Sequence, residues 1–589
     1  MNPLFLLLPL LAALVAVAAD RNGSRVKYYA LLGSVVGLAM LPLVGFGTDS
    51  LTWFSVGGTA IQITTSITPL SLMLLFLVLA MGSLVIAYSF GFMDLPSEQK
   101  RFYVEMLGFE TAMLAFAMSG GFILLFIAWE FLSLTSYLLI GFWHNRENAI
   151  AAARKAITIV LISDIALLAA IVMFLNIYGT LSFSSILAAG ASGSLQLAAM
   201  ALLLAAVITK SAQFPVQEWL TDAMAGPTPV SAYLHSTTMV KAGVFVVLVL
   251  LPLFSEAGMM PALLAIASIT IAVAITGAMR EHNVKRAIAY STVEELGLIL
   301  LAASVGAVFA AIYFFFAQSF YKSLLFFGAG SSIKATGSED LGVITGLGRS
   351  RLVKYTVLFG ALSLAGFIPF DGFFANFGIA SAFATNLVAY ALISAASLAT
   401  SFYIFRWFML QSGKPVSTAV SAGFLGLPKS MSYSMAVLAV STVAASGAFF
   451  AFPSVFGMQG INLQGHAGML TAAIETLVAA AGATAALLFY RRKATVKTLA
   501  ARAVAEPAHS AGVATVTNAA YAHLAAFVEA VATGFAFFDD RLISAYDIVG
   551  HVAVAAGSHS RKIASGSTNT YMLVFAAGVA LLAIVVVVA

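Results

Sequence analysis

The sequence predicts an all-α polytopic membrane protein with about 16 transmembrane helices. First, 61% of its 589 residues are hydrophobic and only 9% are charged, whereas a soluble chain carries about a quarter charged residues. Second, apolar runs of about 20 residues, the length that crosses a bilayer, recur along the whole sequence. Third, the basic residues fall in alternate loops between these runs. The solvent that fits this chain is therefore the bilayer.

Glycine, proline and charged residues divide the apolar runs into separate spans. Their centres lie near residues 11, 37, 80, 112, 131, 165, 203, 239, 269, 297, 317, 366, 396, 442, 480 and 580. We expect the first span to open the mature chain, because no charged leader or small-residue cleavage site precedes Leu4.

The positions of the basic residues predict the topology. All but four of the 29 lysine and arginine residues lie in or beside loops 20–27, 93–104, 143–155, 280–286, 330–354, 411–429 and 491–562. The opposite loops, 47–67, 176–195, 252–260 and 454–468, contain none. Because basic residues favour the cytoplasmic side, both termini are expected on the non-cytoplasmic side of a prokaryotic inner membrane. That arrangement requires an even number of spans.

The segment before the final span is polar enough to lie on the membrane rather than in it. Residues 519–538 could cross, but they contain His523 and Glu529. We expect an amphipathic lateral helix over 493–568 that contacts neighbouring subunits, followed by a terminal span over 569–589. A loose interfacial tail is the alternative.

Several charged residues lie within the apolar runs themselves. The basic ones are Lys210, Lys241, Lys322 and Arg406, and the acidic ones are Glu130, Asp164, Glu294, Glu295 and Asp371. Each costs about 3 kcal/mol or more at the bilayer centre, so such residues normally face protein or water and form pairs. Static ion pairs that fix helix packing are the alternative to a transport path. Arg406 lies near a helix end and can reach the interface by extending its side chain.

Two spans contain a proline at membrane depth, Pro215 and Pro369. Proline frees backbone carbonyls, which are tolerated in a membrane only beside protein or a cavity. The two breaks occupy matching positions in two five-helix blocks, 96–250 and 251–410, and discontinuous helices in inverted repeats indicate a transport site. Three helices over 1–95 precede the repeats, and helices 14 and 15, over 411–492, follow them.

A buried lysine beside a carboxylate can carry protons. Burial favours the neutral amine, whereas a carboxylate within about 4–6 Å favours the ammonium form. At 4 Å and an effective dielectric of 20, that interaction is about 4 kcal/mol. Movement or neutralisation of the acid can therefore switch the lysine between holding and releasing a proton. Glu130 with Lys210 is the candidate pair.

Several runs resemble the antiporter-like subunits of respiratory complex I. The most specific is 210–235, KSAQFPVQEWLTDAMAGPTPVSAYLH, which continues as STTMVKAGV. Further matches are WE at 129–130, SYLLIGF at 136–142, VKRAIAYST at 284–292 and KSLLFFGAG at 322–330. Related chains occur in multisubunit cation/proton antiporters and membrane-bound hydrogenases. FDDRLI at 538–543, followed by a final span, resembles the end of the distal, L-type subunit.

The resemblance implies roles for particular residues. Glu130 and Lys210 would form the proton-channel pair with Asp164 beside them, His235 and Lys241 would continue the central axis, and Lys322 would carry protons across the second half. The sequence departs from the family at Asn376, where a lysine is usual, at Gln318, where histidine is common, and at Glu294 and Glu295. The exit or its modulation is therefore expected to involve Asp371, Lys285 and the two glutamates, or water.

The resemblance implies a proton-translocating membrane subunit of a complex-I-like NADH/quinone-type oxidoreductase. The chain has no cysteine, so iron–sulfur clusters and thiolate metal sites are excluded. We expect no cofactor or metal here, and flavin, iron–sulfur clusters and quinone in partner subunits. A subunit of a Na⁺/H⁺ antiporter or of a hydrogenase-type complex is the alternative. NADH, ferredoxin or another donor, and H⁺ or Na⁺, all remain open, and the net charge of +5 needs no nucleic acid.

Overall fold

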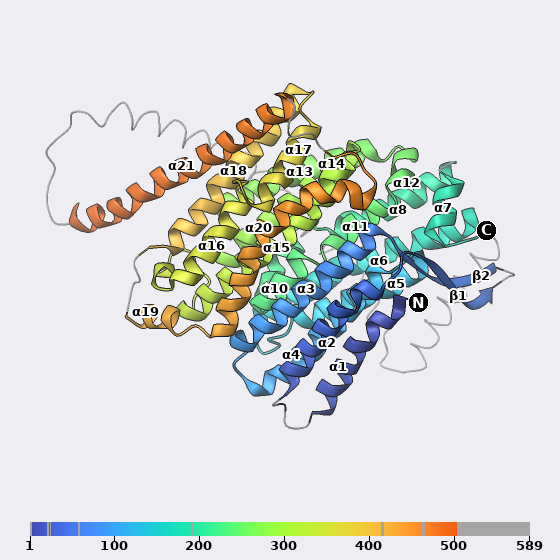
Figure 1. The fold of residues 1–589 in the computed structure, drawn as a ribbon, viewed down its shortest axis with the longest axis horizontal. Helices are drawn as coiled ribbons and strands as arrows, with labels where there is room; N and C mark the ends of the chain where they lie inside the picture. Colours follow the sequence, from blue (N-terminus) through green and yellow to red (C-terminus); the bar gives the residue numbers. More distant parts are fainter. Residues whose placement is uncertain are drawn as a thin grey trace, which may run out of the picture. The chain divides into compact units, whose positions relative to one another are not determined.

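The computed structural model describes residues 3–20, 23, 25–56, 59–190, 193–413, 418–460 and 466–503. Residues Met1–Val496 form one compact unit and Lys497–Ala589 a second. The predicted terminal span and residues 504–568 of the predicted lateral helix lie outside the described residues. The prediction of a mostly helical chain is confirmed (Figure 1).

The helices follow one another through the described part of the chain. They are α1 (Leu7–Ala19), α2 (Val26–Met40), α3 (Pro69–Phe92), α4 (Pro96–Ala117), α5 (Phe122–Ile140), α6 (Glu147–Tyr178), α7 (Phe183–Ala189), α8 (Ser194–Lys210), α9 (Glu218–Asp222), α10 (Thr228–Ser236), α11 (Lys241–Val249), α12 (Leu251–Glu256), α13 (Met260–Arg280), α14 (Val284–Ser304), α15 (Val308–Thr336), α16 (Arg351–Leu364), α17 (Asp371–Ala382), α18 (Leu387–Gln411), α19 (Thr418–Leu425), α20 (Lys429–Phe456) and α21 (His466–Ala503). Short 3-10 turns are η1 (Pro3–Leu6), η2 (Leu41–Leu43), η3 (Ala223–Ala225) and η4 (Leu347–Arg349).

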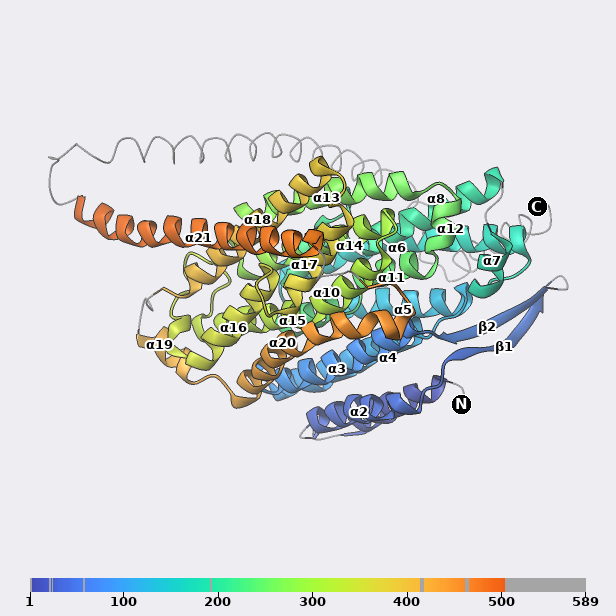
Figure 2. The same ribbon diagram turned by 45° about the horizontal axis from the view of Figure 1, so that its top comes forward.

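A β-hairpin occupies the segment that the sequence reading treated as a loop between the second and third spans. Strands β1 (Gly47–Val56) and β2 (Thr59–Ile67) pair antiparallel, from Gly47 opposite Ile67 to Val56 opposite Thr59. The hairpin is rich in threonine, serine and aromatic residues, which favour strands. Figure 2 shows it extending away from the helices.

Eleven segments of the described chain are long and apolar enough to cross a membrane by length and composition. The predicted centres near 11, 112, 203 and 366 lie instead in shorter, more polar or broken helices. Burial divides the eleven into two kinds. In the spans 228–249, 284–304 and 308–336, 94% of the most apolar window is buried, whereas the figure is 33% for α13 and 28% for α18. The first three therefore form an interior shielded from lipid, where charged residues can lie.

The two proline breaks have the same backbone geometry. α8 ends at Lys210 and α16 ends at Leu364, and a cis proline follows each, Pro215 and Pro369. In the first break, the N–H groups of Ser211, Ala212, Gln213 and Val216 donate to the carbonyls of Val207, Thr209, Ile208 and Gln213. In the second, Ala365, Gly366, Phe367 and Phe370 donate to Ala361, Ser363, Leu362 and Phe367.

Each break thus terminates its helix with a left-handed residue, Ala212 or Gly366, and bonds that run back into the last turn. Four bonds recur at equivalent positions in sequences that differ at most of these residues. This likeness is independent of the charges and supports an internal duplication.

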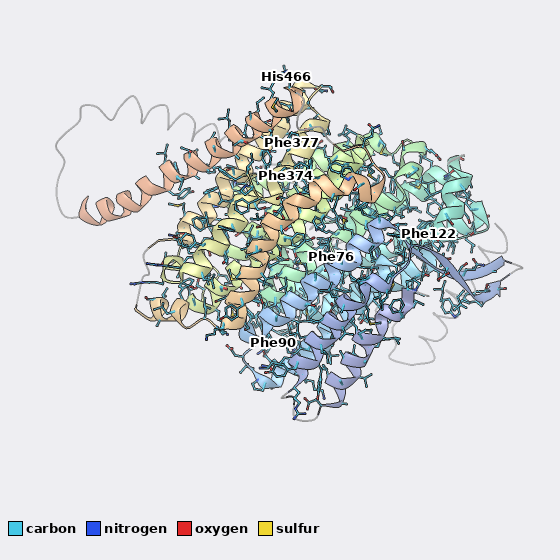
Figure 3. All side chains as sticks on the ribbon, viewed as in Figure 1. Phe76, Phe90, Phe122, Phe374, Phe377 and His466 are labelled. Atoms are coloured by element: carbon cyan, nitrogen blue, oxygen red, sulfur yellow. The ribbon has the colours of Figure 1, made fainter. Side chains whose placement is uncertain are left out.

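Aromatic packing holds the helix after the second break. Phe374 and Phe377 of α17 contact Phe449 of α20, at ring-centroid distances of 5.2 and 6.2 Å. Figure 3 shows both phenylalanines where α17 meets α20. This contact fixes the start of α17 at Asp371 relative to the interior helices.

Gly372 lies where α17 meets the end of α16, and a methyl group added to it has no room. A Cβ there would lie 1.9 Å from the Ser363 carbonyl oxygen. We expect Gly372→Ala to cost about 1–3 kcal/mol of stability through overpacking, seen as a lower melting temperature of the detergent-purified protein.

Gly447 of α20 is the matched control, because a Cβ there meets nothing within 4 Å. Alanine is the better helix former, so Gly447→Ala should leave the melting temperature unchanged or raise it. Equal melting temperatures for the two variants would show that the close approach at Gly372 is not a constraint.

Candidate functional site

Lys210 is fully buried at the last position of α8. Its Nζ donates to Ser133 Oγ at 2.6 Å and to the Trp129 carbonyl at 3.4 Å, both on α5. It lies 4.7 Å from the centroid of the Trp129 ring. The C-terminal end of a helix favours a positive charge. The break after Lys210 therefore creates, inside the bundle, a place that suits an ammonium group.

Asp164 of α6 provides the counter-charge. Its Oδ1 lies 3.8 Å from Lys210 Nζ and accepts from Trp129 Nε1 at 2.6 Å. Its Oδ2 accepts from Ser133 Oγ at 3.0 Å. Ser133 thus contacts both members of the pair. The Ser133 oxygen accepts from the ammonium group while its hydroxyl proton is donated to the carboxylate, so Ser133 bridges the pair.

Glu130, the predicted partner of Lys210, does not contact it. The carboxylate within ion-pair distance of Lys210 is that of Asp164, and Glu130 is only half-buried. Adjacent residues on a helix point in different directions. Because the Trp129 indole faces Asp164, the Glu130 side chain lies on another side of α5. It is still near enough to interact electrostatically with both Lys210 and Asp164.

Lys241 lies at the first position of α11, just after the interruption at residues 237–240. Its Nζ donates to the Phe315 carbonyl at 2.5 Å and to Ser319 Oγ at 2.6 Å, both on α15. The N-terminal end of a helix disfavours a cation. Lys241 therefore lies in the opposite setting to Lys210, and no carboxylate of the described residues is within ion-pair distance of it.

His235 lies between the two halves of the chain. It is fully buried, its ring lies 6.4 Å from those of Trp219 and Phe326, and neither nitrogen has a hydrogen-bond partner within the described residues. A buried imidazole normally satisfies at least one nitrogen. The neighbouring Ser236 bonds Ser323 of α15 at 2.6 Å, next to Lys322.

Lys322 of α15 forms the ion pair of the second half. Its Nζ lies 2.7 Å from Glu295 Oε2 and 2.7 Å from Ser291 Oγ, both on α14. Glu295 also accepts from Gln318 and Tyr321, each at 2.9 Å. The three donors satisfy the carboxylate, and the pair is closer than Lys210 and Asp164.

Glu294 faces away from this pair toward α18. It accepts from the Tyr403 hydroxyl at 2.6 Å and from the Thr400 hydroxyl. Because adjacent residues on a helix diverge, the two glutamates contact different neighbours. The contacts of Glu294 join α14 to α18.

Asp371 begins α17 directly after the second break and is fully buried. Its Oδ1 accepts from Ser363 Oγ at 2.5 Å and from the Gly372 N–H at 3.0 Å, whereas Oδ2 has no partner among the described residues. Asn376, in place of the family's usual lysine, lies beside Gly366 in the same break. The second break thus presents a carboxyl group and an amide but no cation.

Lys285 lies at the N-terminal end of α14. It pairs with Glu339 at 2.6 Å and donates to the Gly226 carbonyl at 3.2 Å. Lys285 and Glu339 line a cavity of about 310 Å³ together with Arg146 and Trp143. The charge pattern predicts this end to be cytoplasmic, on the side opposite to an expected proton exit.

Several buried polar atoms of the described residues have no hydrogen-bond partner in the protein. They include Ser211 Oγ, Gln213 Oε1, Gln217 Oε1, Ser231 Oγ, both His235 ring nitrogens and Gln318 Oε1. Buried polar atoms normally bond to protein or ordered water. These atoms are therefore suited to contacts with ordered water molecules.

Two buried acids are not among the charged residues predicted from the sequence to lie within the spans. Glu110 of α4 is 1% exposed and accepts from Ser34 at 2.7 Å, and Glu475 of α21 is 3% exposed and accepts from Ser394 of α18 at 2.9 Å. Both interrupt apolar runs, and that signal could have found them. By contrast, Arg406 donates to the carbonyls of Ala278 and Glu281 at the end of α13, as expected of a residue near a helix end.

The Lys322–Glu295 pair allows a test of how much these charges depend on each other. Removal of one member of a buried ion pair costs about 3–5 kcal/mol, because the other charge stays buried. We expect Glu295→Leu to lower the melting temperature markedly, and Glu295→Leu with Lys322→Met to recover most of the loss.

Asp94 provides the control. It pairs with Lys334 at a similar distance, 2.6 Å, but its side chain is 71% exposed. Asp94→Asn should therefore change stability by about 1 kcal/mol or less. A loss as large as that of Glu295→Leu would show that burial does not set the cost.

Two family models match the chain. Residues 119–402 match "NADH:quinone oxidoreductase/Mrp antiporter, TM", and residues 53–103 match "NADH-Ubiquinone oxidoreductase (complex I), chain 5 N-terminus". NADH-quinone oxidoreductase subunit L of Mycobacterium tuberculosis is 33% identical over 474 residues, which cover 75% of this chain and 74% of that protein. The chloroplastic NAD(P)H-quinone oxidoreductase subunit 5 of Hordeum vulgare is 34% identical over 379 residues, 59% of this chain and 50% of its own length.

Solved structures share the fold. A chain in the structure of the Mrp complex from Dietzia sp. superposes with a TM-score of 0.75 at 23% identity, covering 99% of this chain and 63% of that one. A chain of the membrane-bound sulfane sulfur reductase, an archaeal respiratory membrane complex, gives a TM-score of 0.65 at 19% identity, covering 82% and 98%.

These matches confirm the predicted resemblance, although the chain spans only about half the length of the chloroplast relatives. The relatives are membrane subunits, and the helices here are long and apolar. The chain is a multi-pass membrane protein that belongs to the NADH:quinone oxidoreductase/Mrp antiporter family.

Proposed function

We propose that this chain moves protons across the membrane as the L-type subunit of a complex-I-like oxidoreductase, coupled to electron transfer in partner subunits. The observation that carries the proposal is a buried lysine–carboxylate pair in each half of the bundle, Lys210–Asp164 and Lys322–Glu295. Static pairs could fix helix packing, but they would not require Lys241 and His235 between them, both buried without a carboxylate partner. Flavin, iron–sulfur clusters and quinone belong to the partners in this proposal.

The proton path runs along the interior helices. Protons would enter from the cytoplasmic side, be held by Lys210, and pass by way of His235 and Lys241 to Lys322. Ser319 contacts Lys241 and Ser236 contacts Ser323, so α15 presents hydroxyl groups between the lysines. Asp164 and Glu130 set the charge of Lys210 by their distance and protonation. Asp371 is the predicted outlet in the second break.

In the proposed architecture, the chain crosses the membrane 16 times, contains two inverted repeats over 96–250 and 251–410, and has both termini outside the cytoplasm. The likeness of the two breaks supports the duplication. An odd number of helices in each repeat would invert the second copy relative to the first. Discontinuous helices in inverted repeats are typical of transport sites. The lateral helix over 493–568 would contact neighbouring subunits.

An antiporter subunit that exchanges Na⁺ for H⁺ is the second candidate. The fold shared with the Mrp complex over 99% of this chain favours it as the alternative. The two functions differ in what drives transport. An oxidoreductase subunit moves protons when the donor and quinone are supplied, whereas an antiporter moves them when a Na⁺ gradient is imposed.

Proton uptake by inverted membrane vesicles tests the proposal. We expect Lys210→Ala to abolish donor-driven uptake and Glu130→Gln and Asp164→Asn to reduce it, because the lysine then loses its proton-holding site or the charge that regulates it. The amount of assembled complex in each membrane, measured on native gels, is the control. Normal uptake in Lys210→Ala and Glu130→Gln would refute the relay.

The predicted outlet at Asp371 has its own test. Asp371→Asn keeps the hydrogen bonds from Ser363 and Gly372 but removes the titratable group. An outlet at Asp371 requires this variant to slow donor-driven uptake while electron transfer to quinone by uncoupled vesicles continues. Intact pumping in this variant, with pumping lost in Lys210→Ala, would exclude Asp371 as the outlet.

A further inference from the structure

A carboxyl group outside the proposed relay is buried between α21 and α18. Glu475 is 3% exposed and accepts from Ser394 Oγ at 2.9 Å. Ser397 and Tyr390 of α18 also lie beside this carboxyl. Within the described residues, no lysine or arginine lies within ion-pair distance of it. A role in packing alone would favour an apolar residue, because burying a carboxyl without a cation is costly.

The two helices are held closely together at this point. The Ser401 hydroxyl of α18 donates to the Ala479 carbonyl of α21 at 2.6 Å. Gly482 of α21 packs against the backbone of α18, where an added Cβ would lie 2.5 Å from the Leu398 carbonyl oxygen. Figures 1 and 2 show α21 running alongside α18. Glu475 is therefore fixed in the interface rather than free to turn toward lipid.

Hydroxyl groups of α18 contact Glu294 at one end and Glu475 at the other. Thr400 and Tyr403 donate to Glu294, which adjoins Glu295, the partner of Lys322. From Thr400, positions 397, 394 and 390 follow at spacings of three or four residues, and such residues are neighbours along one side of a helix. We call these four residues, Thr400, Ser397, Ser394 and Tyr390, the stripe. The stripe extends about 15 Å along α18.

The direction of the stripe matches an outlet. It runs from mid-membrane, where Glu294 lies near the middle of α14, to the N-terminal ends of α18 and α21. The loop that precedes α21 belongs to the set without basic residues, which the charge pattern places outside the cytoplasm. The Tyr390 hydroxyl lies at the outer end, beside the Glu475 carboxyl.

We propose that protons leave Lys322 laterally, through Glu295 and Glu294, along the hydroxyl groups of Thr400, Ser397 and Ser394 of α18, to Glu475 of α21. This outlet rests on the proposed function and takes the place of the predicted outlet at Asp371 as its last step. A proton accepted by the Glu475 carboxylate is released past Tyr390, and the carboxylate is restored, so the step balances. A lateral outlet is consistent with the second break of this chain, where Asn376 stands at the position at which the resemblance predicts a lysine.

Glu475→Gln tests the outlet in the assembled complex, in inverted vesicles. It keeps the shape and the hydrogen bond from Ser394 but cannot exchange protons. We expect the rate of donor-driven proton uptake to fall at least about tenfold, because a positioned proton-transfer group contributes that much or more to the rate of transfer. Glu475→Asp should restore part of the loss. Electron transfer in the presence of an uncoupler should continue.

Thr476 provides the matched control, since it neighbours Glu475 and its hydroxyl donates to the Ala472 carbonyl of its own helix. Thr476→Val should pump normally. If Glu475→Gln assembles poorly, Ser394→Ala with Ser397→Ala interrupts the same path and should slow pumping while leaving the carboxyl in place. Infrared difference spectra recorded on reduction of the complex should show a carboxyl band that Glu475→Gln removes.

The outcomes separate the two proposals. Loss of pumping in Lys210→Ala with normal pumping in Glu475→Gln and in the Ser394/Ser397 double variant would overturn the lateral outlet and leave the proposed function intact. Normal pumping in Lys210→Ala as well would overturn both. Loss in Asp371→Asn alone would assign the outlet to the second break.

Discussion

The structure depends on one constraint, which is that a charge inside a membrane protein must have a partner of opposite charge or a polar cavity. Lys210 and Lys322 meet it through Asp164 and Glu295. Each pair is reinforced by a serine hydroxyl, Ser133 or Ser291, that contacts the ammonium group. Lys322, Glu295 and Ser291 lie on the deeply buried helices α14 and α15, whereas only 33% and 28% of the most apolar windows of α13 and α18 are buried. Lipid contact is thus left to helices with few charges.

The helix breaks supply the second requirement, polar backbone at membrane depth. Both breaks end a helix with the same hydrogen bonds and a cis proline. In the first, the helix end faces its own terminal lysine, and in the second the corresponding region presents Asp371 to the interior. The same backbone arrangement therefore lies beside a basic residue in the first break and beside an acidic residue in the second. The charge at each break follows from the side chain placed there and not from the backbone.

The two halves differ in their balance of charge. The first half places Lys210 near Asp164 and Glu130, whereas the second places Glu295 and Glu294 near Lys322 and Asp371 near Glu295. In the proposed path, this excess of acids would accept protons from the centre and pass them outward. The tyrosine and threonine of α18 that bind Glu294 extend this acidic region toward a helix outside the two repeats. In the proposed lateral outlet, α21 would share this function with the interior helices.

The sequence by itself determined the membrane class, the positions of most helices, the two breaks and the family, because apolar run length, proline and charge are local properties. It also identified Lys210, Lys241 and Lys322, since a charge in an apolar run is visible without a structure. The tertiary structure decided the partners. It paired Lys210 with Asp164 rather than Glu130, separated Glu294 from Glu295, formed the hairpin over 47–67 and placed Glu475 beside α18. These contacts depend on the rotation of each helix and on residues far apart in the chain, which no local pattern of residues specifies.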